Sequence, residues 1–190
     1  MTRAGRLIYV VGPSGVGKDA LIGYARTRLA GRGPLFAHRY ITRPVDPVGE
    51  NHVALSADEF ADRRAFGCFL MAWHSHGWDY GIGIEVASWL DAGADVVVNG
   101  SRAYLPEARK AVARLVPVFV TAPPAVLRER LLRRGREDAA AIAERIVASK
   151  VRPVDALDAV VIDNGGALES AGERVISVIT GDQAASAPAG

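Results

Sequence analysis

The chain has 190 residues, of which 49% are hydrophobic and 23% charged, and its net charge at pH 7 is +2. This composition is typical of one folded globular domain and excludes a disordered or fibrous chain. The small net charge, with no basic run along the chain, argues against nucleic acid as a partner.

The cellular location follows from two features. Cys68 is the single cysteine, so the chain cannot form an internal disulfide, which suits a reducing compartment. The N-terminal apolar run LIYVV is shorter than the roughly 7–15 residues of a signal peptide or the about 20 of a membrane helix. We therefore expect a cytoplasmic protein that has no membrane partner.

The predicted elements alternate between strand and helix. In chain order they are a strand at 7–11, a helix at 18–30, a strand at 36–41, a polar loop at 42–51, a helix opened by the capping box at 56–59, strands at 68–73 and 78–82, a helix at 84–92, a strand at 95–98, a helix at 103–115, a strand at 116–121, helices at 124–134 and 139–150, a strand at 160–162 and a helix at 167–178. Such alternation predicts an α/β fold, a parallel sheet flanked by helices on both faces. Ligands of such sheets lie beyond the carboxyl ends of the strands, where Gly12, Asn99 and Thr121 fall.

The stretch GPSGVGKDA predicts a phosphate-binding loop, because it has the spacing G-x-x-x-x-G-K between an apolar strand and a helix. Glycines let backbone N–H groups turn toward phosphate oxygens, and the lysine adds a positive charge. The expected nucleotide-binding residues are Gly12, Pro13, Ser14, Gly15, Val16, Gly17, Lys18, Asp19 and Ala20. The alternative is a glycine-rich turn that binds nothing, and the combined spacing, lysine and flanking elements argue against it.

Asp19 departs from the loop pattern, which calls for Ser or Thr after the lysine. In one interpretation its carboxylate replaces that hydroxyl near Mg²⁺, a cation that prefers hard oxygen ligands. In the other, Asp19 only favours the N-terminus of the helix through its negative charge. The residues alone leave both interpretations open.

Two further segments, YITRPVDPVGENHVALSADEF and FLMAWHSHGWDYGI, give the chain a resemblance to guanylate kinases. Those enzymes carry a T-R-x-x-R-x-G-E segment and a later W…YG segment in their monophosphate site. The matching residues are Thr42, Arg43, Gly49, Glu50, Trp73, Tyr80 and Gly81. The resemblance implies a guanylate-kinase-like P-loop NTPase: one kinase domain at 1–180, an acceptor-binding insert at about 36–82, a lid at about 134–146 and a flexible tail at 181–190.

The guanine-reading part of that pattern is missing. Ala72 and Asn99 stand where guanylate kinases have the two acidic residues that read guanine, Asp46 replaces the second arginine, and His52 replaces the phosphate-holding tyrosine. Losing the partners of a buried base edge costs about 10⁴-fold or more in discrimination. A guanylate or other nucleoside monophosphate kinase therefore remains only the alternative.

The segments GKD, ENH, HGWDYGI and VVVNGSR, taken together, are similar to the ribose 1,5-bisphosphate phosphokinase family over about residues 7–167. The resemblance implies ATP and Mg²⁺ as cofactors, and transfer of a phosphoryl group from ATP to ribose 1,5-bisphosphate, giving 5-phosphoribosyl 1-diphosphate (PRPP). In that family the loop itself ends in GKD. The implied partners are these small molecules, and the sequence leaves the oligomeric state and the link to phosphonate breakdown open.

A sugar with two phosphates requires two cationic sites, for which Arg43 and Arg102 are the candidates, since Arg forks suit phosphate oxygens. The other expected acceptor-binding residues are Glu50, Asn51, His52, Tyr80 and Asn99. Arg43 and Glu50 could instead form a loop ion pair. His74 and His76 could be plain loop residues. Trp73, Trp78 and Trp89 could be core or wall residues rather than catalytic ones.

The arginine-rich segment at 127–146 resembles the lid of nucleotide kinases, with Gly135 as a hinge. The resemblance implies that Arg134 and Arg145 reach the transferred group, together with Lys18 and Arg43, and that Arg136 binds the nucleotide. Asn164 is expected near the adenine. A solvated charged helix is the alternative to a lid, and a scaffold module without catalysis is a further alternative to a kinase, which the intact loop argues against.

Overall fold

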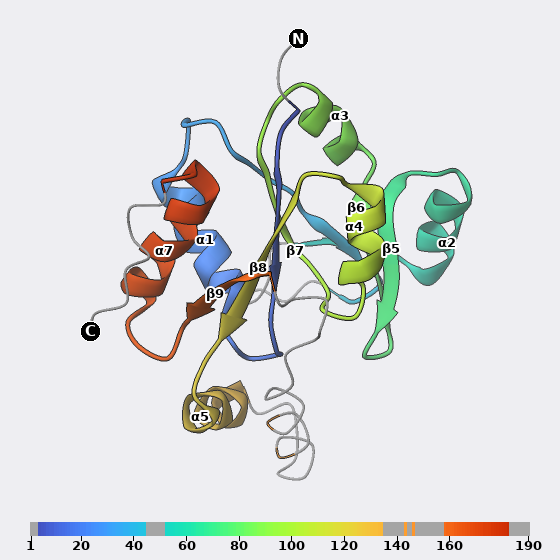
Figure 1. The fold of residues 1–190 in the computed structure, drawn as a ribbon. Coiled ribbons are helices and arrows are strands. Elements are labelled where there is room, and N and C mark those ends of the chain that lie inside the picture. The colour runs from blue at the N-terminus through green and yellow to red at the C-terminus, as the bar shows by residue number, and fades with distance from the viewer. Residues whose placement is uncertain (1–3, 45–51, 135–142, 144–145, 147–157, 183–190) are drawn as a thin grey trace.

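The computed structural model describes residues 4–44, 52–134, 143, 146 and 158–182. Within these residues the main sheet has five strands in the order β2-β7-β1-β8-β9, and every neighbouring pair is parallel, as predicted. The strands are β1 (Leu7–Val11), β2 (Leu35–Phe36), β7 (Val96–Asn99), β8 (Leu115–Thr121) and β9 (Val160–Asp163). All carboxyl ends therefore lie at one edge of the sheet, above α5 (Pro124–Arg134) in the lower part of Figure 1.

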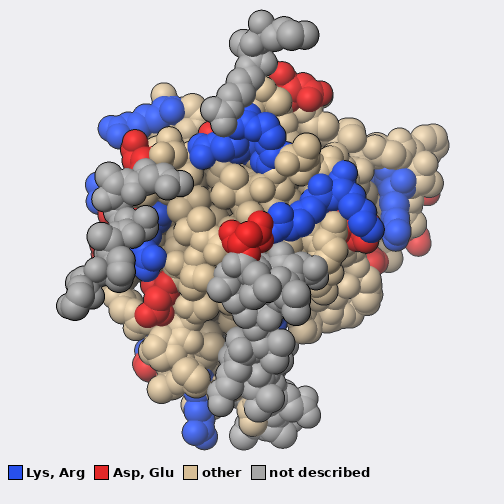
Figure 2. Space-filling model, in the orientation of Figure 1, with Lys and Arg blue, Asp and Glu red and all other residues tan. Residues whose placement is uncertain are grey.

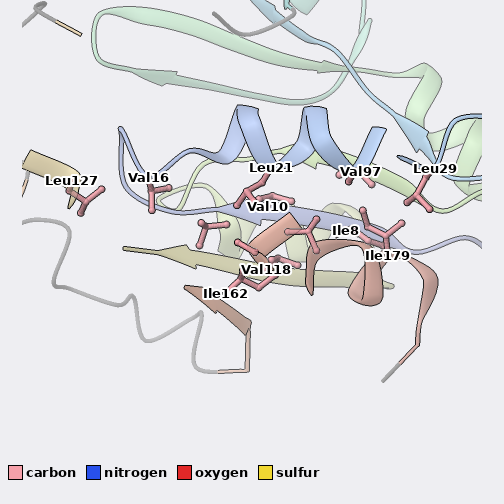
Figure 3. Packing of buried hydrophobic residues seen from close by; sticks show 14 residues of the cluster. Ile8, Val10, Val16, Leu21, Leu29, Val97, Val118, Leu127, Ile162 and Ile179 are labelled. Atoms are coloured by element: carbon pink, nitrogen blue, oxygen red, sulfur yellow. The ribbon is translucent and has the colours of Figure 1, made fainter. Parts of the chain in front are cut away.

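Helices α1 (Lys18–Arg28) and α7 (Leu168–Thr180) cover one face of this sheet (Figure 1). Successive side chains of a strand point to opposite faces, so Ile8 and Val10 point toward these two helices. There they pack with Leu21, Val175 and other buried residues, as Figure 3 shows for part of the cluster. Leu7, Tyr9 and Val11 point to the other face, against α3 (Glu85–Asp91) and α4 (Leu105–Ala111). Both faces of β1 are thus buried, which explains its unbroken apolar sequence.

A second sheet, with four strands among the described residues, lies on the α3 and α4 side in the order β4-β3-β6-β5. The strands are β3 (Arg39–Ile41), β4 (His52–Ala54), β5 (Phe69–Ser75) and β6 (Trp78–Gly83). On its inner face Met71 and Ile82 join the cluster of Tyr9 and Leu105. Its outer face carries α2 (Ala57–Ala65), whose Phe60 stacks on Phe69 with ring centroids 4.6 Å apart. The second sheet therefore faces the main sheet with one side only.

Some predicted boundaries are wrong. The single strand expected at 36–41 is two strands in different sheets, because the chain leaves β7 after Ala37 and joins β6 at Arg39. Strand β4 was missed, and the helix expected at 103–115 is shorter, because Leu115 already pairs with Leu7 in the sheet. The helix expected at 139–150 lies almost wholly outside the described residues, as do most of the polar loop and the tail. The division into insert and lid stays a prediction.

An ion pair between Arg6 and Asp95 joins the amino ends of β1 and β7. Arg6 donates to the Asp95 carboxylate from its backbone nitrogen at 2.6 Å, from Nε at 3.1 Å and from Nη2 at 2.5 Å. The same guanidinium donates to the carbonyl oxygens of Val178 and Ile179 in the last turn of α7. Burial raises the pKa of Asp95, but the hydrogen bonds from Arg6 and its positive charge lower that pKa by more. The pKa of Asp95 therefore lies below its ordinary value. The cluster stabilises the edge of the sheet opposite its carboxyl ends. On the face that Figure 2 shows, basic and acidic side chains are interspersed.

Among the helices in the described part of the chain, none is long and apolar enough to cross a membrane.

Candidate active site

The phosphate loop joins β1 to α1 at the carboxyl edge of the main sheet. Its conformation depends on glycine at two positions, since Gly15 and Gly17 have φ angles of 82° and 95°. A β-carbon on Gly17 would lie 2.5 Å from Nδ2 of Asn164, and one on Gly15 would lie 2.9 Å from a methyl group of Leu131. The buried side chain of Val16 anchors the loop in the core below (Figure 3). The loop is therefore fixed before any nucleotide arrives.

Two side chains from distant elements hold the Val16 carbonyl oxygen. Asn164, directly after β9, donates to it from Nδ2 at 2.7 Å, and Arg130 of α5 donates from Nη1 at 3.2 Å. Asn164 is 2% exposed, and its backbone nitrogen donates to Thr121 at the end of β8. Asn164 was expected beside the adenine, and its contact in the structure is with the phosphate loop. The sequence did not single out Arg130, because neighbouring arginines of the same helix look alike until the helix is docked.

Lys18 lies at the first position of α1, with its side chain folded back over the loop. Its Nζ donates to the carbonyl oxygens of Gly12 at 2.9 Å and Pro13 at 3.1 Å. These carbonyls hold the ammonium group at the mouth of the loop, next to the backbone N–H groups at the start of α1. An anion placed at this helix N-terminus would meet both the helix dipole and the lysine charge.

Asp19 accepts a hydrogen bond of 2.6 Å from Nδ2 of Asn99, the last residue of β7. Its second carboxylate oxygen, Oδ2, takes no hydrogen bond from the residues that the structure describes. A held carboxylate with one available oxygen fits Mg²⁺, which in kinases binds through one or two carboxylates plus phosphate oxygens and water. Within the described ranges no three His, Cys, Asp or Glu residues group to form an all-protein metal site. Asp19 thus has a carboxylate suited to the ion that the family resemblance implies, and its role as a ligand stays a prediction.

The buried amide of Asn99 also leaves an acceptor unused. Asn99 is 6% exposed, and its Oδ1 has no hydrogen-bond partner among the described residues. A buried polar atom without a partner is costly and marks a place where a donor from a ligand or a water fits. The sequence predicted Asn99 as an acceptor-binding residue, and that role stays a prediction.

On the second sheet, Thr42 and His52 are two predicted residues whose side chains contact backbone atoms. Thr42 accepts a hydrogen bond from the Asp79 nitrogen at 2.9 Å, which ties the segment to β6. His52 is buried in β4, with Nε2 3.2 Å from the carbonyl oxygen of Arg43. This contact gives His52 a role in fixing the backbone at Arg43, besides the substrate contact predicted for it.

Aromatic rings line the inner face of this sheet. Tyr80 stacks on Trp73 with centroids 5.6 Å apart and planes 3° apart, and Trp73 lies 5.5 Å from the ring of Tyr104, just before α4. The guanidinium carbon of Arg39 lies 5.2 Å from the Tyr80 centroid. Trp73 is therefore part of a wall, as one of the two interpretations held. Arg39 was not singled out from the sequence, because only the strand register puts it over Tyr80.

Other predicted residues have different outcomes. Arg102 is half-buried in the loop after β7, and burial lowers the pKa of its guanidinium. His74 pairs with Asp79 at 2.9 Å on the exposed hairpin, and His76 has a positive φ of 51° in the turn beside Gly77, so both are hairpin residues. Glu50, Asn51, Arg136 and Arg145 lie outside the described residues, and Arg134 ends α5 with its side chain outside them.

The fold and this site define a P-loop kinase of the guanylate kinase type. A solved structure of guanylate kinase from Anaplasma phagocytophilum is similar to the chain over 97% of its length and 89% of that structure, with a TM-score of 0.69 at 16% sequence identity. That likeness shows the fold alone. No family model matches the chain.

Curated relatives identify the family. The chain is 50% identical to ribose 1,5-bisphosphate phosphokinase PhnN of Desulfomicrobium baculatum over 92% of this chain and 94% of that protein. It is 51% identical to the protein of the same name from Thiobacillus denitrificans over 93% of each. It is also 55% identical to the one from Laribacter hongkongensis, where the match covers 93% of this chain but 43% of that longer protein. The chain belongs to the ribose 1,5-bisphosphate phosphokinase family.

Proposed function

We propose that this chain transfers the γ-phosphoryl group of ATP to ribose 1,5-bisphosphate, forming PRPP and ADP. The observation that carries the proposal is the identity of about half of all residues, over nearly the whole chain, to relatives named for this reaction. The preformed phosphate loop with Lys18 supports ATP as the donor. The missing guanine-reading acids at Ala72 and Asn99 support a sugar rather than a nucleotide as the acceptor.

In the proposed reaction an oxygen of the 1-phosphate attacks the γ-phosphorus of ATP. A new oxygen–phosphorus bond forms, the bond between the γ-phosphorus and the β,γ-bridging oxygen breaks, and ADP leaves with that electron pair. The attacking oxygen already carries a negative charge at neutral pH, since the second pKa of a phosphate monoester is about 6. A general base is therefore unnecessary, and the protein has to align the two phosphates and offset their charge.

The residues divide this work between the two sheets. The loop nitrogens and Lys18 bind the phosphates of ATP, with Lys18 exchanging two carbonyl oxygens for phosphate oxygens. Asp19 would hold Mg²⁺, which offsets charge on the β- and γ-phosphates. Arg43, Arg102, His52, Tyr80 and Asn99, with Glu50 and Asn51, bind the acceptor. Arg134, Arg136 and Arg145 complete the site from the lid. We further propose a cytoplasmic location, where Cys68 stays reduced.

Phosphorus NMR tests the proposal most directly. The purified protein is mixed with Mg-ATP and offered ribose 1,5-bisphosphate in one tube and GMP in another. New diphosphate signals of PRPP, with GMP unchanged, would support the assignment. Conversion of GMP with the sugar untouched would instead establish a guanylate kinase, and no transfer to either acceptor despite ATP binding would refute both.

A further inference from the structure

Arg39 is a positive charge on a sheet face that is otherwise largely apolar. In the strand register Arg39 pairs with Ile82, and Ile41 pairs with Tyr80. Directly paired residues share a face, so Arg39 projects on the same side as Tyr80, Met71 and Ile82. Met71 and Ile82 are buried against the main sheet. Arg39 therefore projects toward the main sheet and not outward to α2.

The guanidinium of Arg39 is oriented by the Tyr80 ring, with 5.2 Å between its central carbon and the ring centroid. Tyr80 in turn is stacked on Trp73. An arginine that lies on an aromatic ring directs its N–H edge along the plane of its guanidinium, a geometry that matches an oxyanion, whereas a lysine has no such plane. The aromatic wall thus holds Arg39 in a geometry suited to a phosphate group.

Arg39 lies close to the Tyr9 hydroxyl at the end of the main sheet. Burial raises the pKa of the Tyr9 phenol, the hydrogen bond with Ser101 opposes that rise, and so does the positive charge of Arg39. The Tyr9 hydroxyl contacts the backbone oxygen and nitrogen of Ser101 at 3.2 Å and 3.0 Å, in the loop that follows β7. Arg39 therefore reaches from the second sheet toward the loop at the carboxyl end of β7.

The order of the strands indicates how Arg39 lies relative to the ATP site. The phosphate loop follows β1, Asn99 ends β7, and Arg39 follows β2 by three residues, with Ala37 still bonded to Val97 of β7. Adjacent strands lie about 4.8 Å apart, so the backbones of β1 and β2, separated by β7, are about 10 Å apart, and Arg39 begins β3, the strand that follows β2. A pentose that carries a phosphate at each end has this reach. Its reacting phosphate can meet the ATP site while the other phosphate lies at Arg39.

We propose that Arg39 binds the acceptor phosphate that does not react, and thereby selects a bisphosphorylated sugar over sugars with one phosphate. The inference rests on the proposed function, in which that group is the 5-phosphate of ribose 1,5-bisphosphate. The acceptor then lies along the carboxyl edge of the sheet, from the phosphate loop past Asn99 and Arg102 to Arg39.

The test compares wild type with Arg39→Gln in steady-state assays on ribose 1,5-bisphosphate. A contact remote from the reacting atoms is made equally in the ground and transition states, so KM is expected to rise about 10- to 100-fold with kcat nearly unchanged. Ribose 5-phosphate should inhibit the variant competitively with the same loss of affinity. Ribose 1-phosphate, which lacks the group, should inhibit both proteins equally.

The matched control is Arg63→Gln, because Arg63 also lies over a tyrosine, Tyr40 at 5.5 Å, but reaches it from α2 on the outer face. This variant should keep the wild-type KM. Arg39→Lys keeps the charge without the fork and should fall between wild type and Arg39→Gln, and it replaces Arg39→Gln if the latter does not fold.

An unchanged KM in Arg39→Gln, or an equal loss of affinity for both monophosphates, would overturn the inference while leaving the proposed function intact. Failure of the wild type to convert ribose 1,5-bisphosphate would refute the proposed function instead. In that case calorimetric titration of ribose 5-phosphate into wild type and Arg39→Gln decides the inference, and equal binding, or binding to neither, would overturn it.

Discussion

The amide nitrogen of Asn99 donates to the carboxylate of Asp19 across 2.6 Å, which joins the end of β7 to the first turn of α1. Asp19 is therefore turned toward the carboxyl edge of the sheet. The described structure shows no side-chain cap at this helix, whose N-cap residue is Gly17. Of the two interpretations of Asp19, the contact favours the magnesium ligand over a simple cap, and its role as a ligand remains a proposal.

Asp19→Ala is expected to raise the Mg²⁺ concentration needed for half-maximal ATP binding about 10- to 100-fold, because an oxygen ligand is lost. Asn99→Ala should raise it about tenfold, the usual cost of removing the partner that orients a ligand. ATP binding is measured by calorimetry over a magnesium series, which needs no turnover. In the double variant the Asn99 effect should vanish, since there is no carboxylate left to orient. Identical magnesium curves for wild type and Asp19→Ala would return Asp19 to a capping role.

Lys18→Ala is expected to lower phosphoryl transfer at least about 10³-fold, as removal of a charge aimed at the transferred group does. The thermal midpoint should change little, because the lysine contacts two loop carbonyls that water can also solvate. Transfer is followed by phosphorus NMR and unfolding by circular dichroism. Lys110→Ala is the control, since Lys110 forms an exposed pair with Glu107 on α4 and should behave as wild type. Full activity of Lys18→Ala would disprove the phosphate-loop assignment.

Gly17→Ala and Gly23→Ala form a matched pair at the start and middle of α1. At Gly17 a β-carbon would press on Asn164 and φ is 95°, so this variant should lose ATP affinity and about 1–3 kcal/mol of stability. At Gly23 a β-carbon meets nothing within 4 Å, and alanine should stabilise the helix by about 0.5–1 kcal/mol. Denaturant unfolding gives both values. Equal effects at the two positions would contradict a preformed loop.

Asp95→Asn is expected to destabilise the protein at pH 7 by about 1.5–3 kcal/mol, the range for hydrogen bonds to a charged group. The pKa of Asp95 is lowered in the folded state, so its contribution is present above the unfolded pKa of about 3.9 and is lost as pH falls through the folded value. The difference in unfolding free energy between wild type and variant should therefore shrink below about pH 4. A difference that stays constant from pH 7 down to pH 3 would rule out ionisation of Asp95 as its source.

The main sheet and the phosphate loop could be predicted because their signals are local. LIYVV is apolar without interruption since both faces of β1 are buried, and the glycines of the loop follow from its backbone angles. The helix at Pro124–Arg134 was predicted with its observed bounds. Such features are set by a few neighbouring residues.

The parts that were missed depend on contacts between distant segments. Strand β4 has three residues and exists through pairing with β3, so its own sequence carries little signal. Arg130 and Arg39 resemble other arginines until docking places one on the Val16 carbonyl and the other over Tyr80. The location of Asn164 at the carboxyl edge of the sheet could be predicted from the sequence, whereas its hydrogen bond to the Val16 carbonyl could not.

The bond from Asn164 to Val16 spans 148 positions of the chain. The phosphate loop is therefore synthesised well before the residue that buttresses it from the far side of the sheet. A nascent chain that has not yet reached β9 would carry the whole nucleotide motif with Arg130 as the remaining donor to the Val16 carbonyl. Such a fragment should bind ATP more weakly, so that nucleotide binding reports the addition of β9 rather than the appearance of the motif.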